Sequence, residues 1–193
     1  GEGDGQAFTE TSSGYVDCAT PRACYPSSKR AAETLCIAYA TEYGTPVTIA
    51  RLCHTYGPGF TESDNRVFAQ FFRNVLRGED IVLKSRGEQY RSWLYVVDSA
   101  HALLHLLLHG ESAQAYNVAD AKGNITIRQL AEQVAAWAQR KVVFDIPATD
   151  NHGNTTPVTR ATFDISKIER TGWQPLFDIA TGLSHSLETL KKP

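Results

Sequence analysis

Helix-like and strand-like segments alternate along this chain, and that alternation limits its fold more than any other feature of the sequence. In the helix-like segments, apolar residues recur at roughly the 3.6-residue period of an α-helix. The segments between them are short runs rich in Val, Ile, Leu and Tyr, as in buried strands. The alternation, without internal repeats, predicts an α/β fold.

The helix-like segments have recognisable ends. Pro26 suits a first helical position, where its missing N–H costs nothing, and Gly44 suits a helix C-terminus. The first helix is therefore expected from Pro26 to about Tyr43, with an apolar stripe formed by Ala31, Ala32, Leu35, Ala38 and Tyr39. Further helices are expected in "RVFAQFFRNVLRG", in "SAHALLHLLLHG" with Asp98 as N-cap, in "ITIRQLAEQVAAWAQR" with Thr126 as cap, in "DISKIERTG" and in "FDIATGLSHSLETLKK".

Strands and loops fill the remaining sequence. The expected strands are "TPVTIARLC", "IVLKS", "RSWLYVV", "AYNVA" and "KVVFDIP". Residues 1–24, the turn cluster "HTYGPG" and the segment "ATDNHGNTTPVTR" are expected to be loops. Ligands of α/β folds gather beyond the carboxyl ends of strands, so His54, Tyr56 and Gly57 stand where a ligand is expected.

Charge and cysteine content argue against several kinds of partner. The formal net charge is −2, so no basic surface for nucleic acid is expected. No apolar run reaches the roughly 18 residues of a spanning helix, and the most apolar stretch, "HALLHLLLHG", contains three histidines. The start of the chain has no signal-peptide pattern, and the four cysteines have no metal-ligand spacing. We therefore expect a cytoplasmic protein with reduced thiols, no metal site and no membrane contact.

Tyr25 and Lys29 stand four residues apart at the start of the first expected helix. This spacing places both side chains on one helix face. Tyrosine is a poor base at neutral pH, but a neighbouring ammonium and the positive end of a helix both favour its phenolate form. The pair therefore predicts an acid–base tyrosine. The alternative is that a helix holds the two residues at this spacing by chance.

Three arginines stand at the starts of expected loops or strands: Arg66, Arg91 and Arg160. A guanidinium can grip a diphosphate through two parallel hydrogen bonds. The alternative for each of them is a solvated residue that begins a helix or strand.

The motifs together resemble the extended short-chain dehydrogenases/reductases that act on nucleotide sugars. The resemblance rests on "CYPSSKRAAETL", "TIARLCHTYGPG", "RSWLYVVDSAHAL", "YNVAD" and "DISKIERTGWQP", and it covers almost the whole chain. "PRACY" with "KRAAETLC" is similar to UDP-glucuronate decarboxylases, and "RSWLYVVD" with "RATFDISKIERTGW" to dTDP-glucose dehydratases. The resemblance implies the C-terminal part of an NAD(P)-binding Rossmann-like fold together with its nucleotide-sugar-binding domain.

The resemblance also implies roles for single residues. Tyr25 takes the proton of the sugar 4-hydroxyl, and Lys29 binds the nicotinamide ribose of NAD and assists the tyrosine. His54 stands where an asparagine usually contacts the sugar nucleotide. Arg91 matches the arginine that binds the nucleotide diphosphate, and Arg160 matches a later arginine on the same part of the substrate. Arg66 matches an arginine of the decarboxylase-like members. Pro26 departs from the family pattern, in which a small residue follows the tyrosine.

The largest departure is the NAD cradle. The family begins with a strand, a Gly-rich turn and a helix that holds the pyrophosphate, whereas "GEGDG" has no strand-like run before it and no helix-like run after it. We expect residues 1–60 to be the end of the cofactor domain and residues 61–193 to be mostly the substrate-binding domain. Such a chain is not expected to transfer hydride alone, and its exposed apolar faces predict self-association or rearranged packing of residues 1–60.

Two alternatives to the enzyme portion remain open. The first is a non-catalytic module that binds sugar nucleotides and has lost the cofactor half. An in-frame Gly-rich strand–turn–helix upstream of Gly1 favours the enzyme over this module. The second is a classical dehydrogenase of small alcohols, which would end soon after the tyrosine helix. The resemblance further implies a homodimer with a UDP- or dTDP-sugar as ligand.

Overall fold

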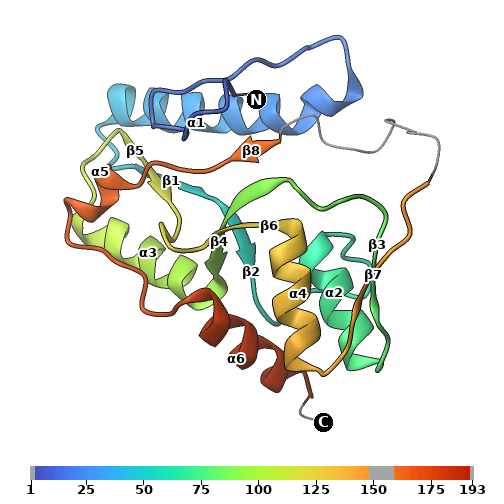
Figure 1. Cartoon of the computed structure of the whole chain (residues 1–193). Coiled ribbons are helices and arrows are strands. Elements are labelled where there is room, and N and C mark those ends of the chain that lie inside the picture. The colour runs from blue at the N-terminus through green and yellow to red at the C-terminus, as the bar shows by residue number, and fades with distance from the viewer. Residues whose placement is uncertain (1–2, 148–158, 192–193) are drawn as a thin grey trace.

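A computed structural model describes residues 3–147 and 159–191 of this chain. Helices and strands alternate along it (Figure 1). In chain order the elements are η1 (Pro21–Ala23), α1 (Cys24–Tyr43), β1 (Thr48–Leu52), β2 (His54–Tyr56), α2 (Val67–Leu76), β3 (Ile81–Leu83), β4 (Tyr90–Tyr95), α3 (Val96–His109), β5 (Gln114–Val118), β6 (Asn124–Thr126), α4 (Ile127–Trp137), β7 (Val142–Phe144), β8 (Arg160–Ala161), α5 (Ser166–Glu169) and α6 (Ile179–Lys191). The prediction of an α/β fold is confirmed.

Most strand pairs of the described residues are parallel. β1 pairs with β5, β2 with β4, β3 with β7 and β4 with β8 in parallel, and β4 pairs with β6 in the antiparallel direction. The two ends of β4 therefore have different neighbours: Trp93 lies opposite His54, and Arg91 lies opposite Ala161. This strand links the region around β2 to the region around β8.

Two clusters of apolar side chains form the core. The larger one joins α2, α4 and α6 to β3 and β4, with Phe72, Leu130 and Leu187 fully buried. The smaller one joins α3 and α5 to β5, around Trp173 and Ile168. Burial of one such side chain contributes about 1.5–3 kcal/mol. The clusters hold β1, β2 and β4 in place, and these strands position the candidate site.

Several predicted helix ends are found in the structure. Gly44 closes α1 in a left-handed conformation with φ 65°. Thr126 begins α4 with a capping box, in which its hydroxyl accepts the N–H of Gln129 and the Gln129 side chain accepts the N–H of Thr126. The predicted loop "ATDNHGNTTPVTR" lies mostly outside the described residues.

Three local predictions were wrong. Pro26 is the third residue of α1 and not the first, because the helix begins at Cys24, directly after η1. Asp98 is not the N-cap of α3, because β4 runs directly into the helix and Tyr95 occupies the N-cap position. The buried Asp98 carboxylate instead accepts the backbone N–H groups of Leu176 and Phe177 at 2.8 and 3.3 Å, which fixes the segment before α6. The predicted turn "HTYGPG" begins as strand β2, because its first three residues pair with β4.

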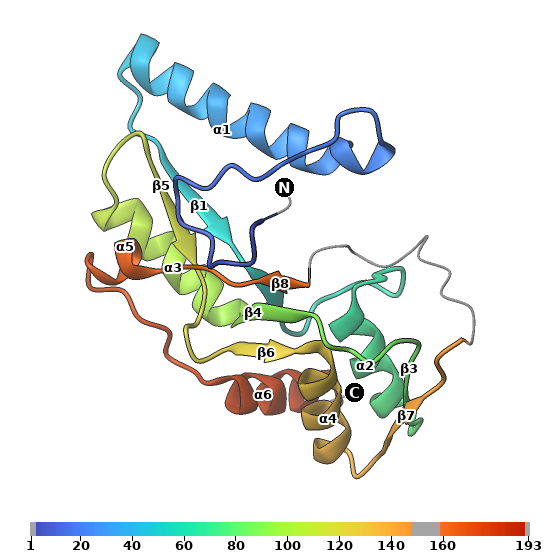
Figure 2. The ribbon, with the colours of Figure 1, turned by 45° about the horizontal axis from the view of Figure 1, so that its top comes forward.

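The α1 helix is the least buried long element. None of its residues is buried, and its predicted apolar stripe faces away from the sheet, with Leu35 60% exposed. Figures 1 and 2 show α1 and α3 on opposite sides of the β1–β5 pair. α3 also exposes leucines, among them Leu104, Leu107 and Leu108. Among the described residues, no helix is both long enough and apolar enough to cross a membrane.

Candidate functional site

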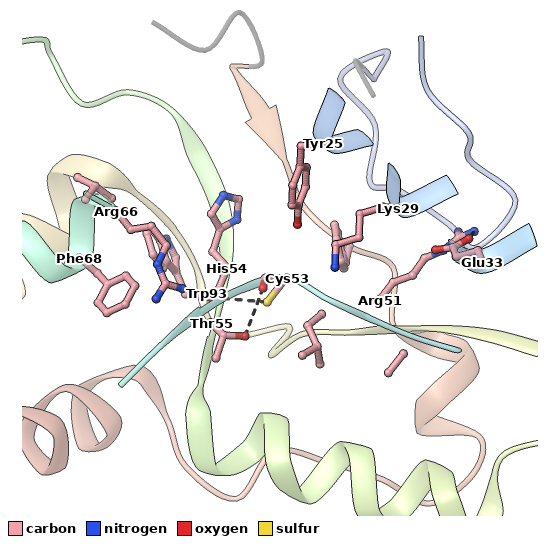
Figure 3. Close-up of a pocket in the computed structure, with 14 residues that line it drawn as sticks. Tyr25, Lys29, Glu33, Arg51, Cys53, His54, Thr55, Arg66, Phe68 and Trp93 are labelled. Carbon is pink, nitrogen blue, oxygen red and sulfur yellow. Dashed lines mark hydrogen bonds and ion pairs between the residues drawn. The ribbon is translucent and has the colours of Figure 1, made fainter. Parts of the chain in front are cut away.

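A cavity of about 700 Å³ opens between α1 and the carboxyl end of β1. Its walls include Tyr25, Lys29, Arg51, His54, Arg66 and Trp93 (Figure 3). A second cavity of about 830 Å³ shares Tyr25, Lys29 and His54 with the first. The tyrosine and the lysine therefore stand where two hollows meet.

Tyr25 and Lys29 lie on the same side of α1. Both side chains point from the helix toward the cavity, and the Lys29 Nζ atom lies 5.7 Å from the centre of the Tyr25 ring (Figure 3). Tyr25 is 72% exposed, so its hydroxyl is open to a ligand. Tyr25 is also the second residue of α1, whose N-cap Ala23 offers no side-chain acceptor to the first N–H groups. The positive end of the helix thus lies beside the phenol.

A polar clamp that the sequence analysis missed holds α1 against the sheet. The Arg51 guanidinium on β1 donates to both carboxylate oxygens of Glu33 on α1, at 2.8 and 2.7 Å, and to the carbonyl oxygen of Glu10 at 2.7 Å. The bonds to Glu33 raise the pKa of Arg51. Glu33 lies one helical turn after Lys29, so the clamp fixes the turn of α1 next to the lysine.

The signals for this clamp were present in the sequence but incomplete. Glu33 repeats the four-residue spacing of Tyr25 and Lys29, which places a carboxylate on the same helix face. Its partner Arg51 belongs to a strand 18 residues later. Sequence spacing does not tell which side of the β1 sheet faces α1, so the pairing required the structure.

His54 stands at the start of β2 and lines both cavities. Its ring lies 5.4 Å from the ring of Trp93, centre to centre. The loss of water around the imidazole, and secondarily the positive charge of Arg91, lower the pKa of His54. The ring is therefore neutral at neutral pH, and it can offer one hydrogen-bond donor and one acceptor.

The three predicted arginines differ in their surroundings. Arg66 precedes α2, lines the first cavity and pairs with Asp64 at 2.6 Å, which lowers the pKa of Asp64 to about 2. Arg91 is buried within β4, donates to the carbonyl oxygen of Tyr90 at 3.1 Å and has its pKa lowered by burial. Arg160 lies on the neighbouring β8 with its guanidinium 5.1 Å from the Tyr90 ring.

The structure thus divides the six predicted site residues into two groups. Tyr25, Lys29, His54 and Arg66 line one cavity. Arg91 and Arg160 lie outside the described walls of that cavity, on the paired strands β4 and β8. Their predicted roles in binding and catalysis remain predictions.

The described residues include groups that could hold one end of a dinucleotide cofactor. Tyr25 and Lys29 present a hydroxyl and an ammonium to the cavity, and both groups could hydrogen-bond a ribose. No strand–turn–helix of the kind that holds a pyrophosphate is found among residues 3–23, where η1 is the first helix. The described part of the chain likewise contains no group of three His, Cys, Asp or Glu side chains that could hold a metal ion.

Comparison with known proteins places the chain in a family. Residues 1–119 match the model of the NAD dependent epimerase/dehydratase family. A relative, UDP-glucuronic acid decarboxylase 6 of Arabidopsis thaliana, is 35% identical over 176 residues, which are 91% of this chain and 50% of the relative. The chain therefore spans about half the length of this relative.

Solved structures agree with the sequence match. UDP-glucose 4-epimerase of Thermotoga maritima, solved with UDP-glucose, matches 86% of this chain and 53% of its own chain, with TM-score 0.74 and 26% identity. The dTDP-glucose 4,6-dehydratase DesIV of Streptomyces venezuelae, solved with NAD, matches 97% of this chain and 55% of its own, with TM-score 0.73 and 26% identity. These matches confirm the Rossmann-like fold class, and the chain belongs to the NAD-dependent epimerase/dehydratase family.

Proposed function

We propose that this chain supplies the acid–base pair and the substrate side of an NAD-dependent nucleotide-sugar epimerase, dehydratase or decarboxylase. One observation carries the proposal: Tyr25 and Lys29 point from one face of α1 to the place where two cavities meet. A ligand hydroxyl in one cavity and a cofactor in the other would both reach the phenol. The Lys29 ammonium lies beside the Tyr25 ring, 5.7 Å from its centre, and the phenol oxygen is the group that would accept the proton.

The reaction begins at C4 of the sugar. Tyr25 would accept the proton of the 4-hydroxyl as the C4–H bond breaks, and the product would be a 4-keto sugar. The hydride acceptor for this oxidation would be NAD, whose nicotinamide ribose Lys29 would hold. The new carbonyl acidifies the C5–H bond and weakens the bond to a C6 carboxylate. This first step is common to the three reaction types.

The polar residues around the cavity suit a nucleotide sugar. A guanidinium pairs with phosphate oxygens through parallel hydrogen bonds. The two phosphates would therefore be bound by Arg66 at the cavity wall and by Arg91 and Arg160 on the paired strands β4 and β8. The neutral His54 would bind a sugar hydroxyl. The names of the relatives support UDP- and dTDP-sugars as the substrate class.

The cofactor side is only partly provided by the described residues. Because they contain no pyrophosphate cradle, we do not expect the 193-residue chain to transfer hydride without a Gly-rich strand–turn–helix added to it. Residues 1–60 would then complete the cofactor domain, residues 61–193 would form most of the substrate domain, and the assembled enzyme would be a homodimer.

Calorimetric titration of the chain with UDP-, dTDP- and GDP-sugars tests the substrate assignment. Arg66→Ala and Arg77→Ala form a matched pair, because both arginines are exposed (59% and 61%), flank α2 and pair with an acid. Only Arg66 lines the cavity. We expect Arg66→Ala to weaken binding about tenfold, as for the loss of one charged hydrogen bond, and Arg77→Ala to leave it unchanged.

Arg91→Ala is expected to abolish the part of the binding that depends on the diphosphate, with circular dichroism showing that this buried substitution leaves the fold intact. Equal binding by the native chain, Arg66→Ala and Arg91→Ala contradicts the assignment.

The second candidate is a non-catalytic module that binds sugar nucleotides. Arg66 and His54 at the cavity wall would serve such a module equally well, whereas binding alone does not need the Tyr25–Lys29 pair. The two are separated by joining the chain to a Gly-rich NAD-binding half of a family member and measuring NADH formation with UDP-sugars. Formation that disappears in Tyr25→Phe supports the enzyme, and binding without any turnover supports the module.

A further inference from the structure

Three histidines form a ladder along α3 that the proposed function does not use. His101, His105 and His109 stand four residues apart, and the ring centres are separated by 6.4 Å for the first pair and 4.6 Å for the second. Two histidines at this spacing on one helix face are a known arrangement for a transition-metal ion. His105 is half-buried, whereas His109 is exposed at the last residue of the helix.

One hydrogen bond fixes which nitrogen of His105 can bind a metal. The Thr171 hydroxyl donates its single proton to the carbonyl oxygen of Ile168 at 2.6 Å. It can therefore only accept from the His105 Nε2 atom, which lies 2.8 Å away. Nε2 then carries the ring proton, and Nδ1 keeps its lone pair. Histidine ligands of metals are usually oriented by such a hydrogen bond from the other ring nitrogen.

The ring separation agrees with coordination of one ion by both imidazoles. With a metal–nitrogen bond of about 2.0–2.1 Å, a ring centre lies about 3.2 Å from the ion. Bond angles of about 90° to 110° at the metal then separate the two ring centres by about 4.5–5.2 Å. The 4.6 Å between His105 and His109 falls in this range, and the 6.4 Å between His101 and His105 does not.

The place on the helix also favours a cation. His109 is the last residue of α3, where the carbonyl groups of the final turn create negative potential. No group of three His, Cys, Asp or Glu side chains completes a metal centre in residues 3–147 and 159–191, so water would fill the other coordination positions. An exposed site of this kind exchanges its ion readily.

We propose that His105 and His109 form a two-imidazole site for a divalent transition-metal ion such as Ni²⁺, Cu²⁺ or Zn²⁺, with Thr171 orienting His105. Two imidazoles do not favour Mg²⁺ or Ca²⁺, because these ions prefer oxygen ligands. The site lies on α3, and α3 is on the opposite side of the β1–β5 pair from α1, the helix that carries Tyr25 and Lys29 (Figures 1 and 2). The proposal is therefore independent of the proposed function.

Calorimetric titration of the full chain with NiCl₂, in buffer containing excess MgCl₂, tests the proposal. We expect one ion per chain, with binding lost in His109→Ala and in His105→Ala. Thr171→Val keeps the shape of the side chain but removes the acceptor of the His105 N–H, and it should weaken binding about tenfold. His185→Ala removes an exposed imidazole of α6 and should change nothing.

The controls separate the imidazoles from other ligands and from folding. All four cysteines are free thiols and remain in every variant, so a difference between variants is not due to sulfur. His109 is exposed, and circular dichroism should show unchanged helix content in His109→Ala. Equal Ni²⁺ affinity in the native chain and in His109→Ala overturns the proposal, as does the lack of any Ni²⁺ binding to the native chain.

Discussion

The clamp between Arg51 and Glu33 yields the most quantitative prediction about the candidate site. Removal of one partner costs little for an exposed ion pair, about 0.2–1 kcal/mol, and about 3–5 kcal/mol for a buried pair. Arg51 and Glu33 are 29% and 30% exposed, and the pair is joined by two hydrogen bonds. We therefore expect Arg51→Leu to cost about 2 kcal/mol.

The stability lost in Arg51→Leu should appear as local opening of α1. This helix has no buried residue, so few other contacts oppose its release from the sheet, whereas the two core clusters lie elsewhere. A cost of about 2 kcal/mol corresponds to a roughly 30-fold larger opening constant. Cys36 is a half-buried reporter on α1, one turn after Glu33. We expect its thiol to react roughly 30-fold faster with a disulfide reagent in Arg51→Leu.

Peptide mapping by mass spectrometry separates Cys36 from the exposed Cys18 and Cys24. The matched control is Arg128→Leu, which breaks an exposed ion pair with Glu132 on α4 and should leave the Cys36 rate unchanged. Glu33→Gln should act as Arg51→Leu does, and the double variant should add little to either change. A Cys36 rate in Arg51→Leu within about twofold of the native rate refutes the reasoning.

Three further predictions concern pH, capping and assembly. Burial raises the pKa of Asp120, so its contribution to stability is present at low pH and is lost as the pH rises through the raised value. The Asp120→Asn variant should therefore have a higher melting temperature than the native chain at pH 7 and the same melting temperature near pH 3. Equal melting temperatures at both pH values contradict this prediction. Thr126→Ala breaks the capping box of α4 and should cost about 1 kcal/mol in urea unfolding, whereas Thr189→Ala on α6 should cost less. The exposed apolar side of α1 predicts self-association, measured by light scattering and reduced by Leu35→Lys, and a monodisperse monomer with protected amides in residues 26–43 argues against it.

The features that could be predicted from the sequence are those with local signals. Gly44 and Thr126 act within one helical turn of their own positions, so the ends of α1 and α4 were predictable. The spacing of Tyr25 and Lys29 likewise determines that they share a helix face. The apolar stripe of α1 was visible too, but its orientation toward solvent depends on what packs against the helix.

Features that depend on distant partners were missed. The Asp98 carboxylate binds backbone groups of Leu176 and Phe177, far along the chain, rather than the start of its own helix. β2 exists because its residues pair with β4, although "HTYGPG" has the composition of a turn. The Arg51–Glu33 clamp joins a strand to a helix. In each case the deciding hydrogen bonds cross between elements, and a local pattern cannot specify them.

The most direct test of the central claim is to observe Tyr25 while a nucleotide sugar binds. The chain contains eight tyrosines, and Tyr25→Phe assigns the ring signals of Tyr25 in a ¹³C-tyrosine sample. On titration with UDP-glucuronate, we predict that the Tyr25 signals shift in step with binding, and that Lys29→Met reduces the shift. Saturable binding that leaves the Tyr25 signals unmoved contradicts the claim that the Tyr25–Lys29 pair faces the substrate.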